Sequence, residues 1–322
     1  MSSKALRVGG TALLCAAILR LFASGLPEKW ISRLTEPEVV AFAIYMETGR
    51  NVRFSPSEET FSVDFVESPP PATQGSTQQP LPSFSEPEKV SMYDACSARA
   101  DIGTLLEKQL QWDLTGGDPT VLILHTHSTE SYTKSGEDYE ETSAYRTLDE
   151  NYNMLSIGRR VAQLLAEQGI TAMQDTSFHD YPSYNGSYVD ARKSIRRYLE
   201  EYPTIALVLD LHRDASGEGT RQMRTKAEVN GVPSAQLMLV MGVNPRNFEK
   251  NLAFSLKLHV QLENLYPGIT RPLQFRAARY NQDLAPAAVL VEVGAAGNTH
   301  QEALTAAEAL AQAILTLADG TQ

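Results

Sequence analysis

The sequence has little cysteine and no cysteine pairs spaced for a metal. Its 322 residues include two cysteines, Cys15 and Cys96, and neither belongs to a CxxC motif or a Cys/His cluster. Cys15 lies inside an apolar N-terminal run, so we expect no structural disulfide with Cys96. Any metal site in this chain must therefore be built from histidine and carboxylate side chains.

Basic residues are also in deficit. There are 28 Lys and Arg against 39 Asp and Glu, which gives a formal net charge of -11. A nucleic-acid partner favours a basic face, so we expect none here. A hydrophobic content of 42% and a mean hydropathy of -0.26 are typical of a globular protein, not of a disordered or multiply membrane-spanning one.

Long apolar runs are scarce, and the clearest one is N-terminal. Lys4 and Arg7 precede an apolar stretch at about 12–26, which Arg20 interrupts. A basic flank followed by such a run indicates a secretion signal or a single membrane anchor over residues 1–30. An ordinary buried helix is the alternative. We expect a single-pass protein of the cell membrane with its main domain outside, or a secreted protein if the segment is cleaved.

Three further regions follow. Residues 31–66 form a small membrane-proximal region. Residues 67–90 are rich in Pro, Ser and Gln, a composition that cannot bury a core and predicts a flexible linker. Residues 91–322 form the main domain.

The main domain alternates short apolar runs with longer amphipathic ones. Continuous Val/Ile/Leu runs predict strands buried on both faces, at 121–125, 170–175, 205–212, 235–242 and 287–294. Helical patterns separate or follow them, at 153–169, 190–203, 247–268 and 300–318. This order predicts an α/β fold: a three-layer, open, twisted, largely parallel sheet with helices on both faces.

Side chains able to bind a metal or move a proton stand where three of these strands end. The first strand leads into His125 and His127, another into His212 and Arg213, and a third into Glu292. In open α/β sheets the functional residues gather at the carboxyl ends of strands. Taken singly, each histidine could be a hydrogen-bonded structural residue and Glu292 could form a salt bridge.

The combined pattern resembles the zinc-dependent N-acetylmuramoyl-L-alanine amidases. In that family a strand leads to a ligand His, and a ligand Glu lies five residues before the Leu of an Ile-x-Arg-Arg-type helix. A second strand ends in a ligand His, and a Val-Glu-x-Gly segment carries the catalytic Glu. The positions that match here are His127, Glu150, His212 and Glu292. On residues alone, Glu150 could simply complement the dipole of the following helix.

The sequence matches one branch of this amidase group more closely than the others. The segments HTHSTESY, LDLHRDA, RTKAEVNG, YNQDL and VEVGAAGN resemble the stage II sporulation protein P family of endospore-forming bacteria, over about residues 118–315. The chain departs from the amidase pattern after His127, where Ser128-Thr129-Glu130 replaces the usual glycines. We therefore keep Glu130 as an additional candidate. His125 stands two residues from His127, on the same side of an extended strand, so either could be the ligand; we favour His127 because it fits the family spacing.

The resemblance implies one Zn²⁺ per chain, held by His127, Glu150 and His212, with Glu292 handling protons. Two imidazoles and one carboxylate leave a fourth position open, as in catalytic zinc sites. Arg213 could stabilise the oxyanion or could pair with Glu150 or Asp210.

The implied activity is cleavage of the amide between muramic acid and the stem peptide of peptidoglycan during sporulation, in septal wall degradation and engulfment. The resemblance also implies endopeptidase action, a lytic transglycosylase partner and membrane sporulation proteins as partners. The alternatives are a zinc endopeptidase or carboxypeptidase on wall peptides, and a catalytically silent wall-binding scaffold.

Overall fold

The computed structural model describes two strands near the N-terminus and most of the chain beyond residue 85. The described residues are 52–57, 60–65, 86–94, 100–110, 112–133, 145–215, 217–218, 221–243 and 247–319. The predicted anchor at 1–30 and residues 67–85 of the predicted linker lie outside them. In the described ranges, no helix has the length and apolar character that crossing a membrane requires.

The chain divides into two units, Met1–Gln79 and Pro80–Gln322. In the first unit, β1 (Val52–Ser57) and β2 (Thr60–Phe65) pair as an antiparallel hairpin. The candidate site lies entirely in the second unit.

The second unit is built on a seven-stranded sheet of order β3-β12-β11-β13-β6-β4-β5. These strands are β3 (Met92–Asp94), β4 (Val121–Leu124), β5 (Ala172–Gln174), β6 (Leu207–Asp214), β11 (Leu237–Gly242), β12 (Leu273–Arg276) and β13 (Ala288–Ala295). All neighbours pair in parallel except β11 and β13, which are antiparallel. The predicted α/β class with a mostly parallel sheet is confirmed.

Helices and two small hairpins complete the unit. They are η1 (Pro87–Lys89), α4 (Ile102–Glu107), α5 (Met154–Glu167), α6 (Ser187–Glu201), α7 (Phe248–Leu265) and α8 (His300–Asp319), with the hairpins β7 (Gly217–Glu218)/β8 (Arg221–Gln222) and β9 (Ala227–Val229)/β10 (Val232–Ser234). Every strand and helix predicted above has a counterpart here. The sequence patterns missed β3, β12 and α4, which are three to six residues long and too short for a clear period.

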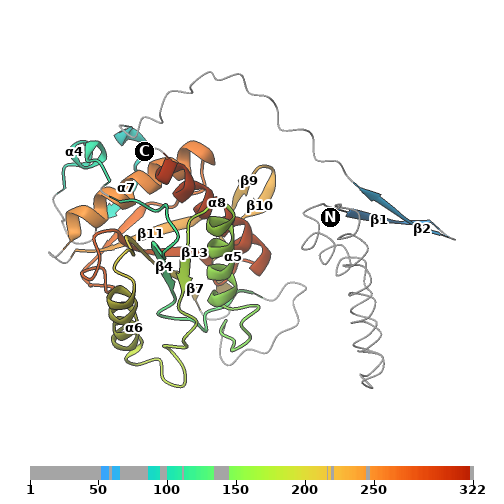
Figure 1. Ribbon diagram of the computed structural model, residues 1–322, viewed down its shortest axis with the longest axis horizontal. Helices are drawn as coiled ribbons and strands as arrows, with labels where there is room; N and C mark the ends of the chain where they lie inside the picture. The colour runs from blue at the N-terminus through green and yellow to red at the C-terminus, as the bar shows by residue number, and fades with distance from the viewer. Residues whose placement is uncertain are drawn as a thin grey trace, which may run out of the picture. The chain divides into compact units, whose positions relative to one another are not determined.

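The helices divide unequally between the two faces of the sheet (Figure 1). The main core joins one face to α5, α7 and α8, while α6 packs on the other face through Ala191 and Ile195. Beyond α6, over β11 and β13, only Met238, Val240 and Leu290 form a small cluster with Tyr280. This face is therefore less covered, which leaves room for a site.

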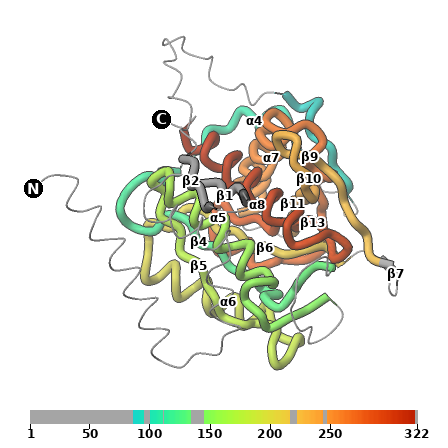
Figure 2. The backbone as a smooth tube through the Cα atoms, turned by 90° about the vertical axis from the view of Figure 1, so that its right-hand side faces the viewer, coloured from blue at the N-terminus to red at the C-terminus, as the bar shows by residue number. Residues whose placement is uncertain are grey.

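Helix α7 is enclosed on both sides. One side joins the main core, and η1 and α4 contact the other; α4 lies beside α7 in both views (Figures 1 and 2). The Trp112 ring contacts the Phe254 ring at 5.1 Å, and Lys89 donates to Asn264. Residues 86–90, assigned above to the linker, thus pack against the domain.

Strand alternation decides which side chains reach the open face. In β6, Leu207, Leu209 and Leu211 point into the main core. Asp210 and His212 therefore project to the α6 side, because successive side chains point to opposite faces. The same alternation in β13 sends Glu292 to the face that carries Leu290.

We expect Gly158→Ala to destabilise the protein by about 1–3 kcal/mol, because the added methyl overpacks a filled contact. A Cβ at Gly158 in α5 would stand 2.5 Å from both His125 Nε2 and Gln174 Nε2. Thermal unfolding measures the effect. Gly103→Ala in α4 is the matched control, since its nearest neighbour would be Asp101 Oδ1 at 3.6 Å and a helical Gly→Ala change is favourable. Equal melting of the two variants would contradict the packing described here.

Candidate metal centre

Two expected functional residues come together through strand pairing. His212 in β6 and Glu292 in β13 are register partners of a parallel pair. Register partners on neighbouring strands present their side chains to the same face. Neither residue ends its strand, since β6 continues to Asp214 and β13 to Ala295.

The two histidines after β4 point to opposite sides. Strand β4 ends at Leu124, so the chain does not stay extended through His127. His125 is fully buried beneath Gly158 of α5, with Nδ1 3.2 Å from the Leu211 carbonyl oxygen and Nε2 3.0 Å from Gln174. His127 lies on the α6 side, with its ring 4.9 Å from that of His212. The expectation that both share one side is thus not met, and His127 is the histidine beside His212.

Glu130 supplies the carboxylate that faces both histidines. Its Oε1 lies 3.4 Å from His127 Nδ1, and its Oε2 lies 3.5 Å from His212 Nδ1. The residue is 4% exposed. Arg146 donates to Oε1 and the Arg213 backbone N–H donates to Oε2. Although burial opposes ionisation, Arg213 and the two histidines hold the pKa of Glu130 well below its usual range.

These donor atoms have the spacing that zinc requires. One ligand atom each from His127, Glu130 and His212 can be chosen so that all lie within 4.8 Å of one another. A tetrahedral zinc ion with ligands at about 2.1 Å holds adjacent donors roughly 3.4 Å apart; the two distances above, one from each Glu130 oxygen, are close to this value. The residues present therefore fit a Zn²⁺ ion.

Asp210 is the carboxylate beside the other ring nitrogen of His212. One of its oxygens lies 2.9 Å from His212 Nε2, which leaves Nδ1 directed at Glu130. Asp210 also accepts from the backbone N–H and the hydroxyl of Thr126, which ties β6 to the loop that carries His127. Although burial opposes it, the charges of Asp210 and Glu130 hold the pKa of His212 well above its usual range. Such a setting favours a cation, and a carboxylate behind a ligand histidine is the usual supporting partner in metal sites.

Glu292 has the properties of a proton carrier. Its Oε2 is buried and has no hydrogen-bond partner among the described residues. Burial, helped by the charges of Glu130 and Asp214, raises the pKa of Glu292 to about 8, while His212 and Arg213 oppose that rise. A carboxyl group tuned toward neutrality can take up and release a proton near physiological pH.

The structure places Glu150 away from this group. Glu150 lies in an exposed turn before α5, with its side chain 52% exposed and 3.8 Å from Arg159. The cap of α5 is Asn153, whose side chain accepts from the Leu155 N–H. The turn thus serves the helix start, and the carboxylate beside the two histidines is Glu130.

Arg213 is committed to the backbone around Glu130. Its guanidinium donates to the carbonyl oxygens of Ser131 and Tyr145, and the residue is 5% exposed. By alternation Arg213 projects from β6 to the face opposite that of His212. It fits the role of supporting the loop and not that of contacting a substrate.

Two tyrosines that the sequence did not single out stand over the centre. The Tyr184 ring stacks on His127 at 4.6 Å, and the Tyr188 ring lies 5.5 Å from His127 and 6.4 Å from His212. Burial raises the pKa of Tyr188, and the charges of Asp210, Glu292 and Glu130 add to the rise. Nothing in the local sequence marks these tyrosines, because only the fold brings the start of α6 over β6. Asp210 could have been found, since it lies two residues before His212 in a strand.

A β-bulge follows Glu292 within β13, and Asn298 holds the turn that comes after the strand. Gly294 has φ of 72°, and the register with β6 shifts between Glu292 and Ala295. The fully buried Asn298 accepts from the Ala295 and Thr225 N–H groups and donates to Glu302. A β-bulge re-aims neighbouring side chains, so this turn helps to set the direction of Glu292.

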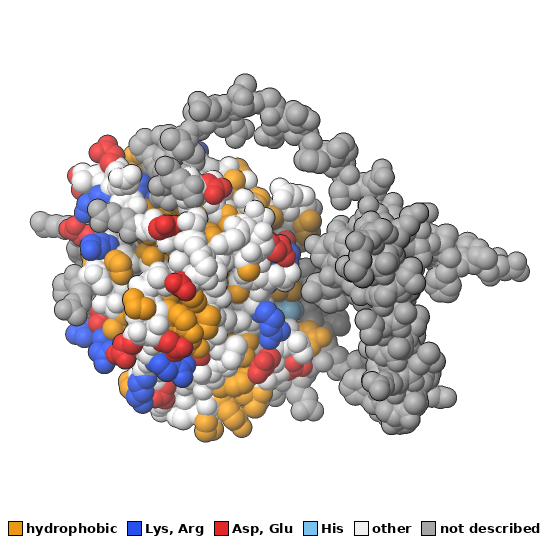
Figure 3. Space-filling view, viewed as in Figure 1, with side chains coloured by type: hydrophobic (Ala, Val, Ile, Leu, Met, Phe, Trp, Pro, Cys, Tyr) orange, Lys and Arg blue, Asp and Glu red, His pale blue; other side chains and the backbone are white. Residues whose placement is uncertain are grey.

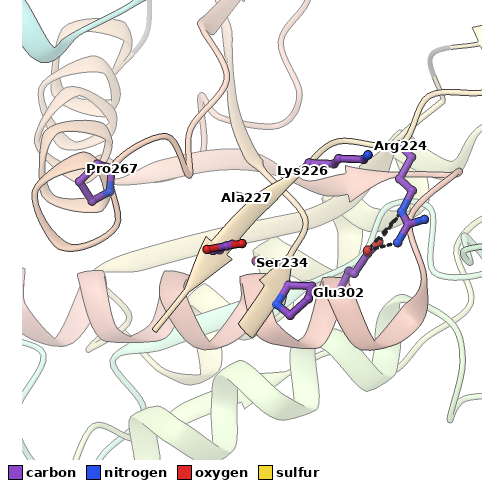
Figure 4. A pocket seen from close by; sticks show the side chains of 8 residues that line it. Arg224, Lys226, Ala227, Ser234, Pro267 and Glu302 are labelled. Atoms are coloured by element: carbon purple, nitrogen blue, oxygen red, sulfur yellow. Dashed lines mark hydrogen bonds and ion pairs between the residues drawn. The ribbon is translucent and has the colours of Figure 1, made fainter. Parts of the chain in front are cut away.

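A groove of about 530 Å³ lies next to that turn, away from the metal-binding residues. The β9–β10 hairpin and the start of α8 form it, with Arg224 bound to Glu302 at one end and Lys226 close by (Figure 4). The molecular face in Figure 3 carries interspersed acidic and basic side chains and no broad patch of one sign.

Fold and site together define an α/β domain with a candidate metal centre on one face of a mostly parallel sheet. The chain belongs to the stage II sporulation protein P (SpoIIP) family, whose profile matches residues 46–315. The family expected from the sequence motifs is thereby confirmed.

Among curated proteins, stage II sporulation protein P of Bacillus subtilis (strain 168) is 28% identical over 260 residues. The match covers 74% of this chain and 63% of that relative, less than two thirds of its length.

Solved structures similar to the chain include the N-acetylmuramoyl-L-alanine amidase AmiC2 of Nostoc punctiforme, at 16% identity and a TM-score of 0.38, covering 62% of this chain and 97% of that one. The CwlD amidase from Clostridioides difficile, solved in complex with the GerS lipoprotein, is similar at 14% identity and a TM-score of 0.40, covering 62% and 98%.

We expect Glu130→Gln to lose zinc and Glu150→Gln to keep it. A neutral amide is a poor zinc ligand, and only Glu130 lies beside both histidines. Zinc content and affinity of the purified full-length variants, by atomic absorption and competition with a chelating dye, measure the difference. The opposite result, with zinc lost only from Glu150→Gln, would return the ligand role to Glu150.

Proposed function

We propose that this chain is a zinc-dependent peptidoglycan hydrolase, an N-acetylmuramoyl-L-alanine amidase that cleaves between muramic acid and the stem peptide during sporulation. The observation that carries the proposal is the convergence of His127, Glu130 and His212 beside the buried, unpaired oxygen of Glu292. Membership of the stage II sporulation protein P family supports the sporulation context.

His127, Glu130 and His212 are the residues that would hold Zn²⁺. When bound, the ion supplies a Lewis acid that polarises the scissile carbonyl and makes a water molecule a nucleophile near neutral pH. The Asp210 carboxylate lies 2.9 Å from Nε2 of His212, so its negative charge supports that side of the ring while Nδ1 faces Glu130. Arg146 and Arg213 neutralise Glu130 and fix the rotamer of its side chain.

Glu292 performs the proton transfers. It accepts a proton from the attacking water and then delivers one to the amide nitrogen of the departing stem peptide. Its pKa of about 8 without a metal suits the second step, in which the group gives up its proton; the first step uses the ionised form, which the positive charge of bound Zn²⁺ would favour. Its position as the register partner of His212 supports this role.

Digestion of purified sacculi with the full-length protein, followed by mass spectrometry of the products, tests the proposed activity. We expect free stem peptides and glycan strands without peptides, and no release after removal of zinc with a chelator. Cleaved crosslinks without free stem peptides would identify an endopeptidase. No release by the zinc-loaded protein would leave a wall-binding scaffold.

We expect Glu292→Gln to bind zinc with the wild-type affinity and to lose turnover by about 10²–10⁴-fold. Glutamine keeps the size of the side chain but cannot carry the proton, whereas His212→Ala should lose both zinc and activity. Zinc content and the rate of stem-peptide release on the same preparations separate the two roles. If Glu292→Gln emptied the site of zinc, Glu292 would be a ligand.

We further propose that residues 1–30 anchor the chain in the membrane with the hydrolase domain outside. The motivation is the order of basic flank, apolar run and Pro-rich stretch in the sequence. With residues 86–90 packed on the domain, the remaining linker of residues 67–85 would span roughly 24 Å as a flexible chain, which we expect to reach the membrane-proximal wall. Protease treatment of spheroplasts should degrade the domain. A protected domain would place it in the cytosol, and recovery in the medium would show that the segment is cleaved.

A further inference from the structure

None of the described side chains assigned so far donates a hydrogen bond to the charge that forms on the substrate's carbonyl oxygen, which bound Zn²⁺ alone would support. During amide hydrolysis, water adds to the carbonyl carbon, the carbonyl oxygen takes the electron pair, and the C–N bond then breaks as the nitrogen receives a proton. Hydrogen-bond donors directed at that oxygen supply much of the rate enhancement in such reactions. Arg213, the residue that the sequence suggested for this role, binds backbone carbonyl oxygens behind Glu130.

The other cationic side chains beside the centre are also engaged. Arg146 binds Asp180, Glu130 and Thr129. Arg192 at the start of α6 forms a two-pronged ion pair with Asp283. Both guanidinium groups are held in these contacts, so a neutral donor among the described residues is the better candidate.

Tyr188 lies where such a donor is needed. Its ring is nearly parallel to that of His212, with an angle of 11° between the planes, and meets the His127 ring edge to face at 76°. Its ring therefore lies beside both histidines of the centre, on the α6 side of the sheet. The Tyr188 hydroxyl has no hydrogen-bond partner within the described ranges, although the side chain is partly buried.

The backbone around Tyr188 is held from two sides. Its carbonyl oxygen accepts from the side chain of Asn281, a residue with φ of 55°, and its ring lies 5.8 Å from that of Tyr280. A donor gains catalytic value when it is fixed before the reaction begins, because no reorganisation is then needed. The Tyr188 ring packs against its neighbours, but its hydroxyl makes no hydrogen bond that would stabilise the described part of the fold.

We propose that Tyr188 is a catalytic residue that donates a hydrogen bond from its hydroxyl to the substrate's carbonyl oxygen as negative charge develops there. The inference rests on the proposed amidase function. The tyrosine keeps its proton throughout, and Glu292 carries the protons of the reaction. The contact strengthens as the oxygen becomes negative, so it acts on turnover more than on substrate binding.

Tyr188→Phe tests the proposal, because phenylalanine keeps the ring that packs on His127 and His212 and removes only the hydroxyl. We expect kcat for stem-peptide release to fall by about 10²-fold, with KM, zinc content and melting temperature nearly unchanged. Tyr198→Phe, which removes a hydroxyl from the same helix away from the centre, is the matched control and should keep wild-type kcat.

Binding supplies a second readout that does not depend on turnover. We expect the zinc-loaded Tyr188→Phe variant to bind a muramoyl phosphinate, in which a tetrahedral phosphinate replaces the scissile amide, about 10²-fold more weakly than wild type. Its affinity for N-acetylmuramoyl-L-alanyl-D-isoglutamine, measured by calorimetry in the Glu292→Gln background, should change by less than about threefold.

The outcomes separate the inference from the function on which it rests. If the wild type releases no stem peptides, the proposed amidase function fails. If the wild type is active and Tyr188→Phe retains its kcat and its phosphinate affinity, the hydroxyl has no catalytic role and this inference alone is overturned.

Discussion

The parallel pairing of β6 with β13 is the constraint on which the candidate centre depends. It makes His212 and Glu292 register partners on one face, so the sheet alone makes a candidate metal ligand and the candidate proton carrier neighbours. The strand interiors secure this register, since Leu209, Leu211 and Val291 are buried in the main core. A slip of one residue would turn all of these side chains to the wrong face.

Buried charge is the second organising feature. Glu130, Asp210 and His212 are each less than 5% exposed, a costly arrangement unless the charges compensate one another. Glu130 faces two histidines and two arginines, and Asp210 holds the other nitrogen of His212. The centre is therefore balanced around a position suited to a cation, and the same residues connect the β4 loop to β6. Tyr132 adds a further tie, since its hydroxyl donates to the Val293 carbonyl oxygen.

The unequal cover of the two sheet faces explains how the site is reached. Three helices pack on one face and only α6 on the other, so polar side chains that alternate onto the α6 side find open space beyond that helix. His125 and Arg213 project to the opposite side and are fixed there by carbonyl oxygens. The face of the sheet to which a side chain points, more than its residue type, distinguishes the candidate site residues from the structural ones.

The sequence by itself determined the fold class, the order of the main strands and helices, the family, and the positions of His127, His212 and Glu292. Those features follow from local periodicity and from short motifs, which can be recognised in the amino-acid sequence alone. The tertiary structure decided which carboxylate meets the histidines, because β4 ends at Leu124 and the following turn carries Glu130 inward, while Glu150 stays on an exposed turn. It also decided that Tyr188 stands over the centre. Contacts between segments this far apart depend on how the helices pack on the sheet, and no local pattern encodes that packing.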